Sequence, residues 1–282
     1  MGQEITVIGV GQMGTGIAQA ALQVGYSVVL IDKNIDFLNK GFARLTTNLD
    51  KALEKGKITA QEKEAMLKRV KLSQTMDAIK DSSIIMEAVP ELIDLKLEIF
   101  KNADKFCSKD SILATNTSSI LINRLATAVS DPSRFIGLHF FNPANVMKLV
   151  EVVVGEKTSK KTVDESLAFI TSMNKIPVKV NDAPGFISNR ILMVFINESI
   201  TALEKGIAEK EAIDSIAKLG FNHPMGPIEL ADFIGLDVCK DIMDFIYLET
   251  KEEKFKPSPL LVKLVKEGKL GRKAGEGFYK YN

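Results

Sequence analysis

The sequence predicts an α/β fold followed by an all-α C-terminal domain. Near the N-terminus, a β-rich apolar segment leads into a glycine-rich turn and then a helical pattern. Strand-like and helical segments then alternate as far as residue 183, and such alternation is typical of a sheet with helices on both faces. Beyond that residue the hydrophobic periodicity is helical throughout. We therefore expect two domains, residues 1–183 and 184–282.

The elements follow in order along the chain. Residues 5–8 form a buried strand, a helix follows the glycine turn, and residues 27–31 form a second strand, which together make a βαβ unit. Residues 37–54 have the apolar stripe of an amphipathic helix. Further strands are predicted over 83–89, 111–115, 135–140, 149–154 and 177–180, and helices over 92–106, 121–128 and 163–173.

The composition excludes several classes of protein. The 282 residues include 37 Lys+Arg and 36 Asp+Glu, a net charge of +1, which argues against a nucleic-acid or membrane-surface binder driven by charge. A content of 45% hydrophobic and 26% charged residues is typical of a soluble globular protein. The two cysteines, Cys107 and Cys239, predict no disulfide framework and favour the cytoplasm. The uncharged stretch from Ile5 to Ile31 is too rich in glycine and glutamine for a membrane helix, and no metal site is predicted.

The glycine turn predicts a dinucleotide site. In Gly9-Val10-Gly11-Gln12-Met13-Gly14, the first glycine makes the turn, the second lets the backbone approach the pyrophosphate, and the third packs the helix on the strand. Asp32 ends the second strand, where its carboxylate would bind the ribose hydroxyls and repel a 2′-phosphate. We therefore predict a Rossmann-like domain that binds NAD through Gly9, Gly11, Gln12, Met13, Gly14 and Asp32.

Two histidines are candidates for acid/base chemistry. His139 ends an apolar strand, where α/β sheets bind ligands, although by itself it could equally be structural. Glu151 lies in the next strand, and antiparallel pairing would bring it to His139; the alternative is a solvent-exposed glutamate. His223 lies in a turn-rich loop and is more simply a loop hydrogen-bonding residue. On their own, Ser118 would be taken for a helix cap and Asn189 for a surface residue.

Taken together, the motifs resemble the L-3-hydroxyacyl-CoA dehydrogenases, and most of all the bacterial 3-hydroxybutyryl-CoA dehydrogenases. The resemblance extends over both predicted domains. It is carried by the glycine turn, Glu87-Ala88-Val89, Asn116-Thr117-Ser118-Ser119, His139-Phe140-Phe141-Asn142-Pro143, Pro184-Gly185-Phe186-Ile187-Ser188-Asn189-Arg190, Asn222-His223-Pro224-Met225-Gly226-Pro227 and Gly271-Arg272-Lys273-Ala274-Gly275-Glu276-Gly277-Phe278-Tyr279.

The resemblance implies NAD-dependent interconversion of (S)-3-hydroxybutyryl-CoA and acetoacetyl-CoA. His139 matches the family's acid/base and Glu151 its partner, and Ser118 and Asn189 match residues that hold the reacting oxygen and the thioester region. The resemblance also implies a homodimer formed through the C-terminal domain. Positions that match cofactor contacts are Glu91, Lys96, Asn116, Ser118, Asn142 and Lys273.

Lys51 and Lys55 have two interpretations. Periodicity alone makes them part of the solvated face of an amphipathic helix. The resemblance favours them as contacts for the ADP 3′-phosphate of coenzyme A. Two rival functions share the fold: a sugar-acid dehydrogenase of the crystallin-related branch, which needs no such phosphate contacts, and a non-catalytic NAD-binding protein.

Overall fold

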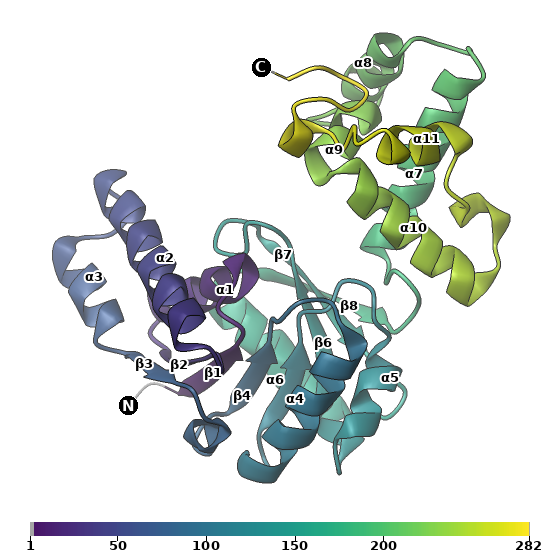
Figure 1. Cartoon of the computed structure of the whole chain (residues 1–282). Coiled ribbons are helices and arrows are strands. Elements are labelled where there is room, and N and C mark those ends of the chain that lie inside the picture. The colour runs from purple at the N-terminus through teal and green to yellow at the C-terminus, as the bar shows by residue number, and fades with distance from the viewer. Residues whose placement is uncertain (1–2, 282) are drawn as a thin grey trace. The chain divides into compact units, whose positions relative to one another are not determined.

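A computed structural model describes residues 3–281 and divides the chain into two compact units, Met1–Asp182 and Ala183–Asn282 (Figure 1). The strands of the first unit are β1 (Glu4–Ile8), β2 (Ser27–Ile31), β3 (Val70–Ser73), β4 (Ile84–Glu87), β5 (Ile112–Thr115), β6 (Phe135–Phe140), β7 (Leu149–Val154) and β8 (Ile176–Asn181). Its helices are α1 (Gln12–Gln23), α2 (Ile35–Glu54), α3 (Ala60–Leu67), α4 (Ile93–Phe106), α5 (Ile122–Leu125) and α6 (Lys160–Ser172). Short 3-10 turns are η1 (Met76–Ile79), η2 (Ala126–Ala128) and η3 (Pro132–Arg134).

The eight strands form one sheet in the order β3-β2-β1-β4-β5-β6-β7-β8. All neighbouring pairs are parallel except β6 and β7, which are antiparallel. From β3 to β6 this is the Rossmann strand order, so the predicted fold class is confirmed. The order reverses between β1 and β4, and in such sheets ligands bind beyond the carboxyl ends of the strands at this point.

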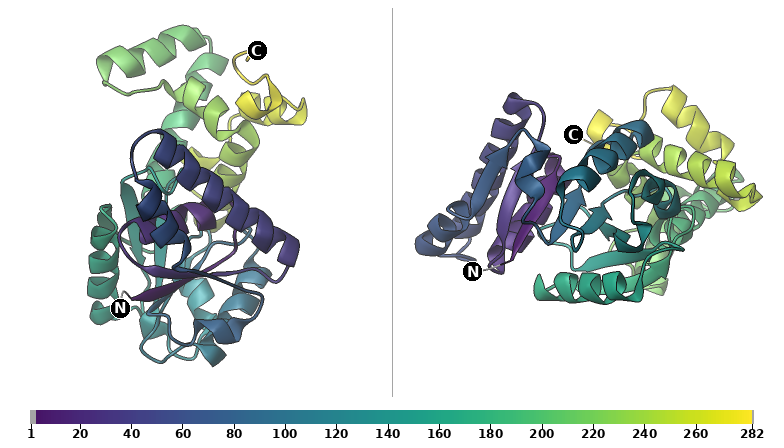
Figure 2. Two further views of the ribbon diagram at one scale, coloured as in Figure 1. Left: turned by 90° about the vertical axis from the view of Figure 1, so that its left-hand side faces the viewer. Right: turned by 90° about the horizontal axis from the view of Figure 1, so that it is seen from below.

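Helices cover both faces of the sheet (Figures 1 and 2). On one face, α1, α2 and α6 bury a continuous apolar core against the strands, including Ile17, Leu45 and Phe169. On the other face, Phe100 of α4 meets Phe135 of β6 edge to face, with ring centroids 4.6 Å apart. Because both faces are covered, the central strands are buried and mostly apolar, as the sequence indicated.

Two elements were missing from the sequence prediction. Helix α3 begins with a capping box, in which Thr59 and Glu62 bond each other's backbone N–H groups. Strand β3 is at the edge of the sheet and is half-exposed, so it has no apolar run to reveal it. The predicted helix over 121–128 is divided into α5 and η2.

The second unit is helical, as predicted. Its elements are α7 (Ser188–Glu204), α8 (Lys210–Gly220), α9 (Pro227–Ile234), α10 (Leu236–Thr250), α11 (Pro259–Lys266) and the 3-10 turns η4 (Glu253–Phe255) and η5 (Arg272–Ala274). Apolar residues of α7, α9, α10 and α11, such as Ile196, Ala231, Met243 and Leu261, share one core. None of the helices within residues 3–281 combines the length and apolarity needed to cross a bilayer.

A buried aspartate holds the segment after α11 against this core. Asp232 is 1% exposed and accepts hydrogen bonds from the backbone N–H groups of Phe278 and Tyr279 and from the hydroxyl of Tyr281, at 2.8–2.9 Å. A Cβ atom added at Gly277 would lie 2.0 Å from Asp232 Oδ1. The glycine in this motif is therefore required by packing against the carboxylate.

Candidate active site

The glycine turn joins β1 to α1 at the point where the strand order reverses. Gly9 has φ +95°, and a Cβ atom there would lie 2.7 Å from the carbonyl oxygen of Ala88, which follows β4. A Cβ atom at Gly14 would lie 1.9 Å from the carbonyl oxygen of Gly9. Both glycines are therefore required by the protein's own backbone.

Gly11 differs from these two. Its φ is −67°, which any residue adopts, and an added Cβ atom would have no protein atom within 4 Å. The fold therefore does not need glycine here, whereas close approach of a pyrophosphate to the backbone does. Gly11 also precedes the N-terminus of α1, whose free N–H groups favour an anion, so the turn fits a dinucleotide.

The neighbouring polar side chains are held in place. Asp32 follows β2, and its Oδ1 accepts a hydrogen bond from Asn34 N at 3.1 Å. Gln12 Nε2 donates to Asn142 Oδ1 at 2.9 Å, which links the glycine turn to the loop after β6. Met13 lies half-buried in the first turn of α1.

His139 and Glu151 form a buried pair. They are directly opposite each other in the antiparallel pairing of β6 with β7, and His139 Nδ1 lies 2.8 Å from Glu151 Oε2. The side chains are 10% and 1% exposed. The predicted pairing is confirmed, and the alternative of a solvent-exposed glutamate is wrong. A carboxylate at Nδ1 fixes the orientation of the ring.

The loop after β5 lies beside this pair. Asn116 Oδ1 accepts a hydrogen bond from the backbone N–H of Phe140, the residue after His139, at 2.8 Å. Ser118 is half-buried two residues further on. The amide of Asn116 therefore ties this loop to the strand that carries His139.

Glu91 holds the same loop from the other side. Its Oε1 accepts hydrogen bonds from Ser118 N at 3.0 Å and from Ser119 N at 3.1 Å and Oγ at 2.9 Å, as well as from the Thr117 hydroxyl. Burial opposes the charged form, but the charge of Lys96 and the hydroxyl hydrogen bonds outweigh it and hold the pKa of Glu91 below its usual value. Glu91 is therefore ionised, and its carboxylate accepts the hydrogen bonds that the loop donates.

Among the charged residues predicted to contact the cofactor, Lys96 is the buried one. It is 1% exposed, and its ammonium contacts Glu87 Oε1 at 2.6 Å and Glu91 Oε2 at 3.2 Å. Sequence reasoning did not identify Glu87 as a functional residue. The available signal was a carboxylate within an apolar strand, the same signal that singled out Glu151.

Four of the other predicted residues and His223 lie outside the loops around β5 and β6. Lys51 and Lys55 are exposed at the C-terminal end of α2. In the second unit, Asn189 is half-buried in the first turn of α7, and Lys273 is exposed and donates to Asp237 Oδ2 at 2.6 Å. The ring of His223 lies 5.3 Å from that of Phe195, an aromatic contact in an exposed loop.

Family models account for nearly the whole chain. Residues 4–183 match the model for the NAD-binding domain of 3-hydroxyacyl-CoA dehydrogenase, and residues 185–281 match the model for its C-terminal domain. The chain belongs to the 3-hydroxyacyl-CoA dehydrogenase family. The cofactor of this family's N-terminal domain, and of this chain, is NAD.

Relatives in the 3-hydroxyacyl-CoA dehydrogenase family are similar over their full length. A probable 3-hydroxybutyryl-CoA dehydrogenase of Bacillus subtilis is 46% identical over 279 residues, which cover 99% of this chain and 97% of that protein. The 3-hydroxybutyryl-CoA dehydrogenase of Clostridioides difficile is 44% identical, with 99% of both chains covered. Among solved structures, the (S)-3-hydroxybutyryl-CoA dehydrogenase of Ralstonia eutropha matches with a TM-score of 0.97 at 42% identity over 100% of both chains.

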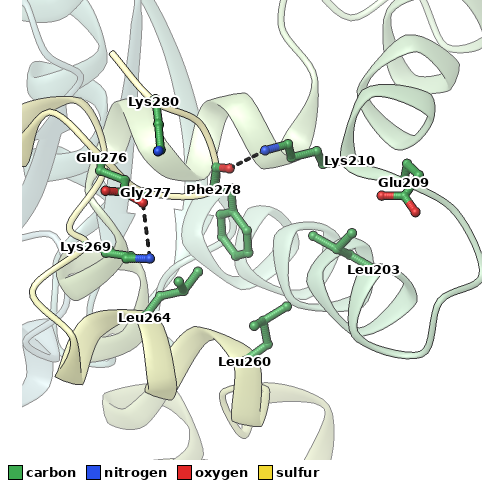
Figure 3. Close-up of a pocket in the computed structure, with 10 residues that line it drawn as sticks. All are labelled: Leu203, Glu209, Lys210, Leu260, Leu264, Lys269, Glu276, Gly277, Phe278 and Lys280. Carbon is green, nitrogen blue, oxygen red and sulfur yellow. Dashed lines mark hydrogen bonds and ion pairs between the residues drawn. The ribbon is translucent and has the colours of Figure 1, made fainter. Parts of the chain in front are cut away.

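A hollow in the family's C-terminal domain contains none of the predicted site residues. Phe278 points toward Leu203, Leu260 and Leu264, and lysines surround this apolar floor (Figure 3). Lys210 Nζ donates to the carbonyl oxygen of Phe278 at 2.6 Å and lies 4.7 Å from the ring centroid of Tyr279. The hollow therefore lies at the packing interface between the segment after α11 and helices α7 and α8.

Proposed function

We propose that this chain interconverts (S)-3-hydroxybutyryl-CoA and acetoacetyl-CoA with NAD as cofactor. The observation that carries the proposal is the His139–Glu151 pair, which lies beside the Asn116 loop at the carboxyl edge of an NAD-binding sheet. The names of the similar proteins support a four-carbon acyl group. They favour this function over a sugar-acid dehydrogenase, and the intact acid/base pair argues against a non-catalytic NAD-binding protein.

His139 moves the proton of the reaction. In oxidation, Nε2 takes the proton of the 3-hydroxyl group, and in reduction it returns a proton to the 3-keto oxygen. Bound NAD would supply or accept the hydride at C3, and the glycine turn from Gly9 to Gly14 would hold its pyrophosphate. Glu151 acts through His139, because its carboxylate at Nδ1 orients the ring and stabilises the imidazolium.

Ser118 and Asn189 are proposed to bind the substrate. We assign the Ser118 hydroxyl to the reacting oxygen and the Asn189 amide to the thioester region. The cofactor residues are Gly9, Gly11, Gln12, Met13, Gly14, Asp32, Glu91, Lys96, Asn116, Ser118, Asn142 and Lys273. Of these, Gly11 is best supported, since its backbone leaves room that the fold does not use.

Lys51 and Lys55 are proposed to bind the 3′-phosphate of coenzyme A. They are one turn apart at the end of α2, so both ammonium groups can reach one phosphate. Arg44, on the same helix, donates from Nη1 to the carbonyl oxygen of Val10 in the glycine turn at 3.4 Å, which joins this helix to the nucleotide end of the site.

The second unit is proposed to form a homodimer. Helix α8 exposes apolar side chains along one face, with Ile216 57% and Leu219 87% exposed, and Phe221 directly follows the helix at 59%. An exposed apolar surface of this kind is typical of an interface. Light scattering on wild type and Leu219→Lys should find a dimer and a monomer, respectively; a monomeric wild type would contradict the proposal.

The cytoplasm is the proposed location, because Cys107 and Cys239 are both free thiols. No nucleic-acid partner is proposed, since the net charge is only +1.

An absorbance assay of NADH oxidation tests the function. We expect turnover with acetoacetyl-CoA, and slower turnover as the acyl chain of the 3-ketoacyl-CoA is lengthened. Turnover of a sugar acid in the absence of activity on acetoacetyl-CoA would establish the rival enzyme, and NADH binding without any turnover would establish the non-catalytic protein.

A further inference from the structure

Glu87 is a fully buried carboxylate at the end of β4. It is 0% exposed, and both of its oxygens are occupied. Oε1 accepts hydrogen bonds from Lys96 Nζ at 2.6 Å and from Val89 N at 2.7 Å, and Oε2 accepts one from Thr115 Oγ1 at 2.7 Å. Glu87 therefore connects three segments: its own strand, the start of α4 and the end of β5.

Lys96 links Glu87 to Glu91. Its ammonium lies between the two carboxylates, with one of them fully buried, and it also donates to the carbonyl oxygen of Val89 at 3.3 Å. A buried ammonium is costly unless charged partners surround it. Glu87 provides the compensation that lets Lys96 remain at this position, and Lys96 in turn fixes Glu91 Oε2.

Glu91 links Lys96 to the loop after β5 that contains Ser118, called here the Ser118 loop. With Oε2 fixed by Lys96, Oε1 is directed at the N–H groups of Ser118 and Ser119. The same loop begins at Asn116, whose backbone N–H donates to the carbonyl oxygen of Glu87 at 2.8 Å. Glu87 thus supports the Ser118 loop at its first residue directly and at its centre through two charged side chains.

We propose that Glu87 is a positioning residue, which holds Ser118 in its reactive orientation through Lys96 and Glu91. The proposal rests on the function assigned above to the Ser118 loop. A buried ion pair that served stability alone could be replaced by apolar residues of similar volume, often without loss of stability. Here the Glu87–Lys96 pair lies at the carboxyl edge of the sheet. Lys96 also contacts Glu91, and Glu91 accepts hydrogen bonds from the loop that borders His139.

The variant Glu87→Gln removes the charge and keeps the size of the side chain. We expect kcat for acetoacetyl-CoA reduction to fall by about tenfold or more, because a small displacement of a reacting group has a large effect on rate. In a Ser118→Ala background, the same substitution should change kcat by less than about twofold, since the group that Glu87 positions is already gone. Equal losses in both backgrounds, or an unchanged kcat, would overturn the proposal.

Asp104→Asn is the matched control. Asp104 is also on α4 and pairs with the buried Arg134, but this pair is at the far end of the helix. Its loss should lower Tm without changing kcat. A comparable fall in kcat in this control would mean that the effect of Glu87→Gln is only structural.

Hydrogen exchange tests the connection without any turnover. In Glu87→Gln, the amides of Ser118 and Ser119 should exchange faster than in wild type, because Glu91 is no longer fixed. If the single variant does not fold, Glu87→Gln with Lys96→Met removes both charges and should give the same faster exchange. Unchanged exchange overturns the role of Glu87, whereas absence of turnover in wild type overturns the proposed function.

Discussion

His139 Nδ1 lies 2.8 Å from Glu151 Oε2, and the two residues are direct cross-strand partners in the only antiparallel pair among the described strands of the sheet. A cross-strand pair is rigid, because the backbone hydrogen bonds of two strands set the separation of the side chains. The reversal of strand direction at β7 is what brings the carboxylate to this end of the sheet.

His139→Gln should lower kcat by at least ~10²-fold and leave the Kd for NADH nearly unchanged, because an acid/base acts only in the chemical step. Steady-state kinetics and fluorescence titration measure the two quantities. Glu151→Gln added to this variant should cause little further loss, since Glu151 acts through the ring. Additive losses would show that Glu151 acts independently.

Gly11→Ala and Gly14→Ala should separate cofactor binding from folding. At Gly11 the new methyl group meets no protein atom within 4 Å, so Tm should stay the same while the Kd for NADH rises. At Gly14 it would overlap the carbonyl oxygen of Gly9, so the free energy of unfolding should fall by ~1–3 kcal/mol or more. Unchanged NADH binding in Gly11→Ala would remove this residue from the pyrophosphate site.

Asp32 should make the enzyme prefer NADH. Its carboxylate, held by Asn34 N, favours ribose hydroxyls and repels a 2′-phosphate. We expect kcat/KM with NADH to exceed that with NADPH by at least about tenfold, or ~1.4 kcal/mol. Asp32→Ser should reduce the difference in kcat/KM between the two cofactors, chiefly by lowering kcat/KM with NADH. A wild-type preference for NADPH would mean that the adjacent Lys33 outweighs Asp32.

Replacing Lys51 and Lys55 with alanine should raise KM for acetoacetyl-CoA. The effect should shrink as salt is added, because exposed charge–phosphate contacts are screened. KM for a truncated thioester that lacks the ADP group is the control and should not change. An equal rise for both substrates would exclude this end of α2 as the phosphate site.

Glu91 should contribute to the pH dependence of stability. Its pKa is lowered in the folded protein from 4.5, so it stabilises the fold above about pH 4.5, and this contribution is lost as the pH falls through the lowered value. Thermal melts at several pH values should therefore show a smaller acid-induced fall in Tm for Glu91→Gln than for wild type. Parallel profiles of the two proteins would contradict the expected contribution.

The fold could be predicted where the chain has a clear period or a required turn. The buried strands, the glycine turn and the Glu151 partner of His139 all follow from local patterns and one assumption about strand pairing. Strand β3 could not be found this way, because Lys71 and Leu72 are exposed at the edge of the sheet and no alternation remains. Helix α3 could have been found from Thr59 and Glu62, since this spacing is that of a capping box.

The site was predicted less completely than the fold. Lys96, on a helix with charged neighbours, has the pattern of a solvent-facing residue, and its burial depends on Glu87 in a strand nine positions earlier. Such a pair is defined only when the helix docks on the sheet. The resemblance marked Lys96 as important, whereas the physical reason, a buried ammonium between two carboxylates, required the three-dimensional arrangement.

The hydrogen bonds to Asp232 also set an order for events during protein synthesis. Helices α7 to α9, and with them Asp232, can emerge from the ribosome before residues 278–281 have been made. Until then the Asp232 carboxylate lacks the three groups that donate hydrogen bonds to it in the folded unit, which are two backbone N–H groups and a tyrosine hydroxyl. A nascent chain stalled before Phe278 would therefore have to keep this carboxylate hydrated, because an unpaired buried carboxylate is costly.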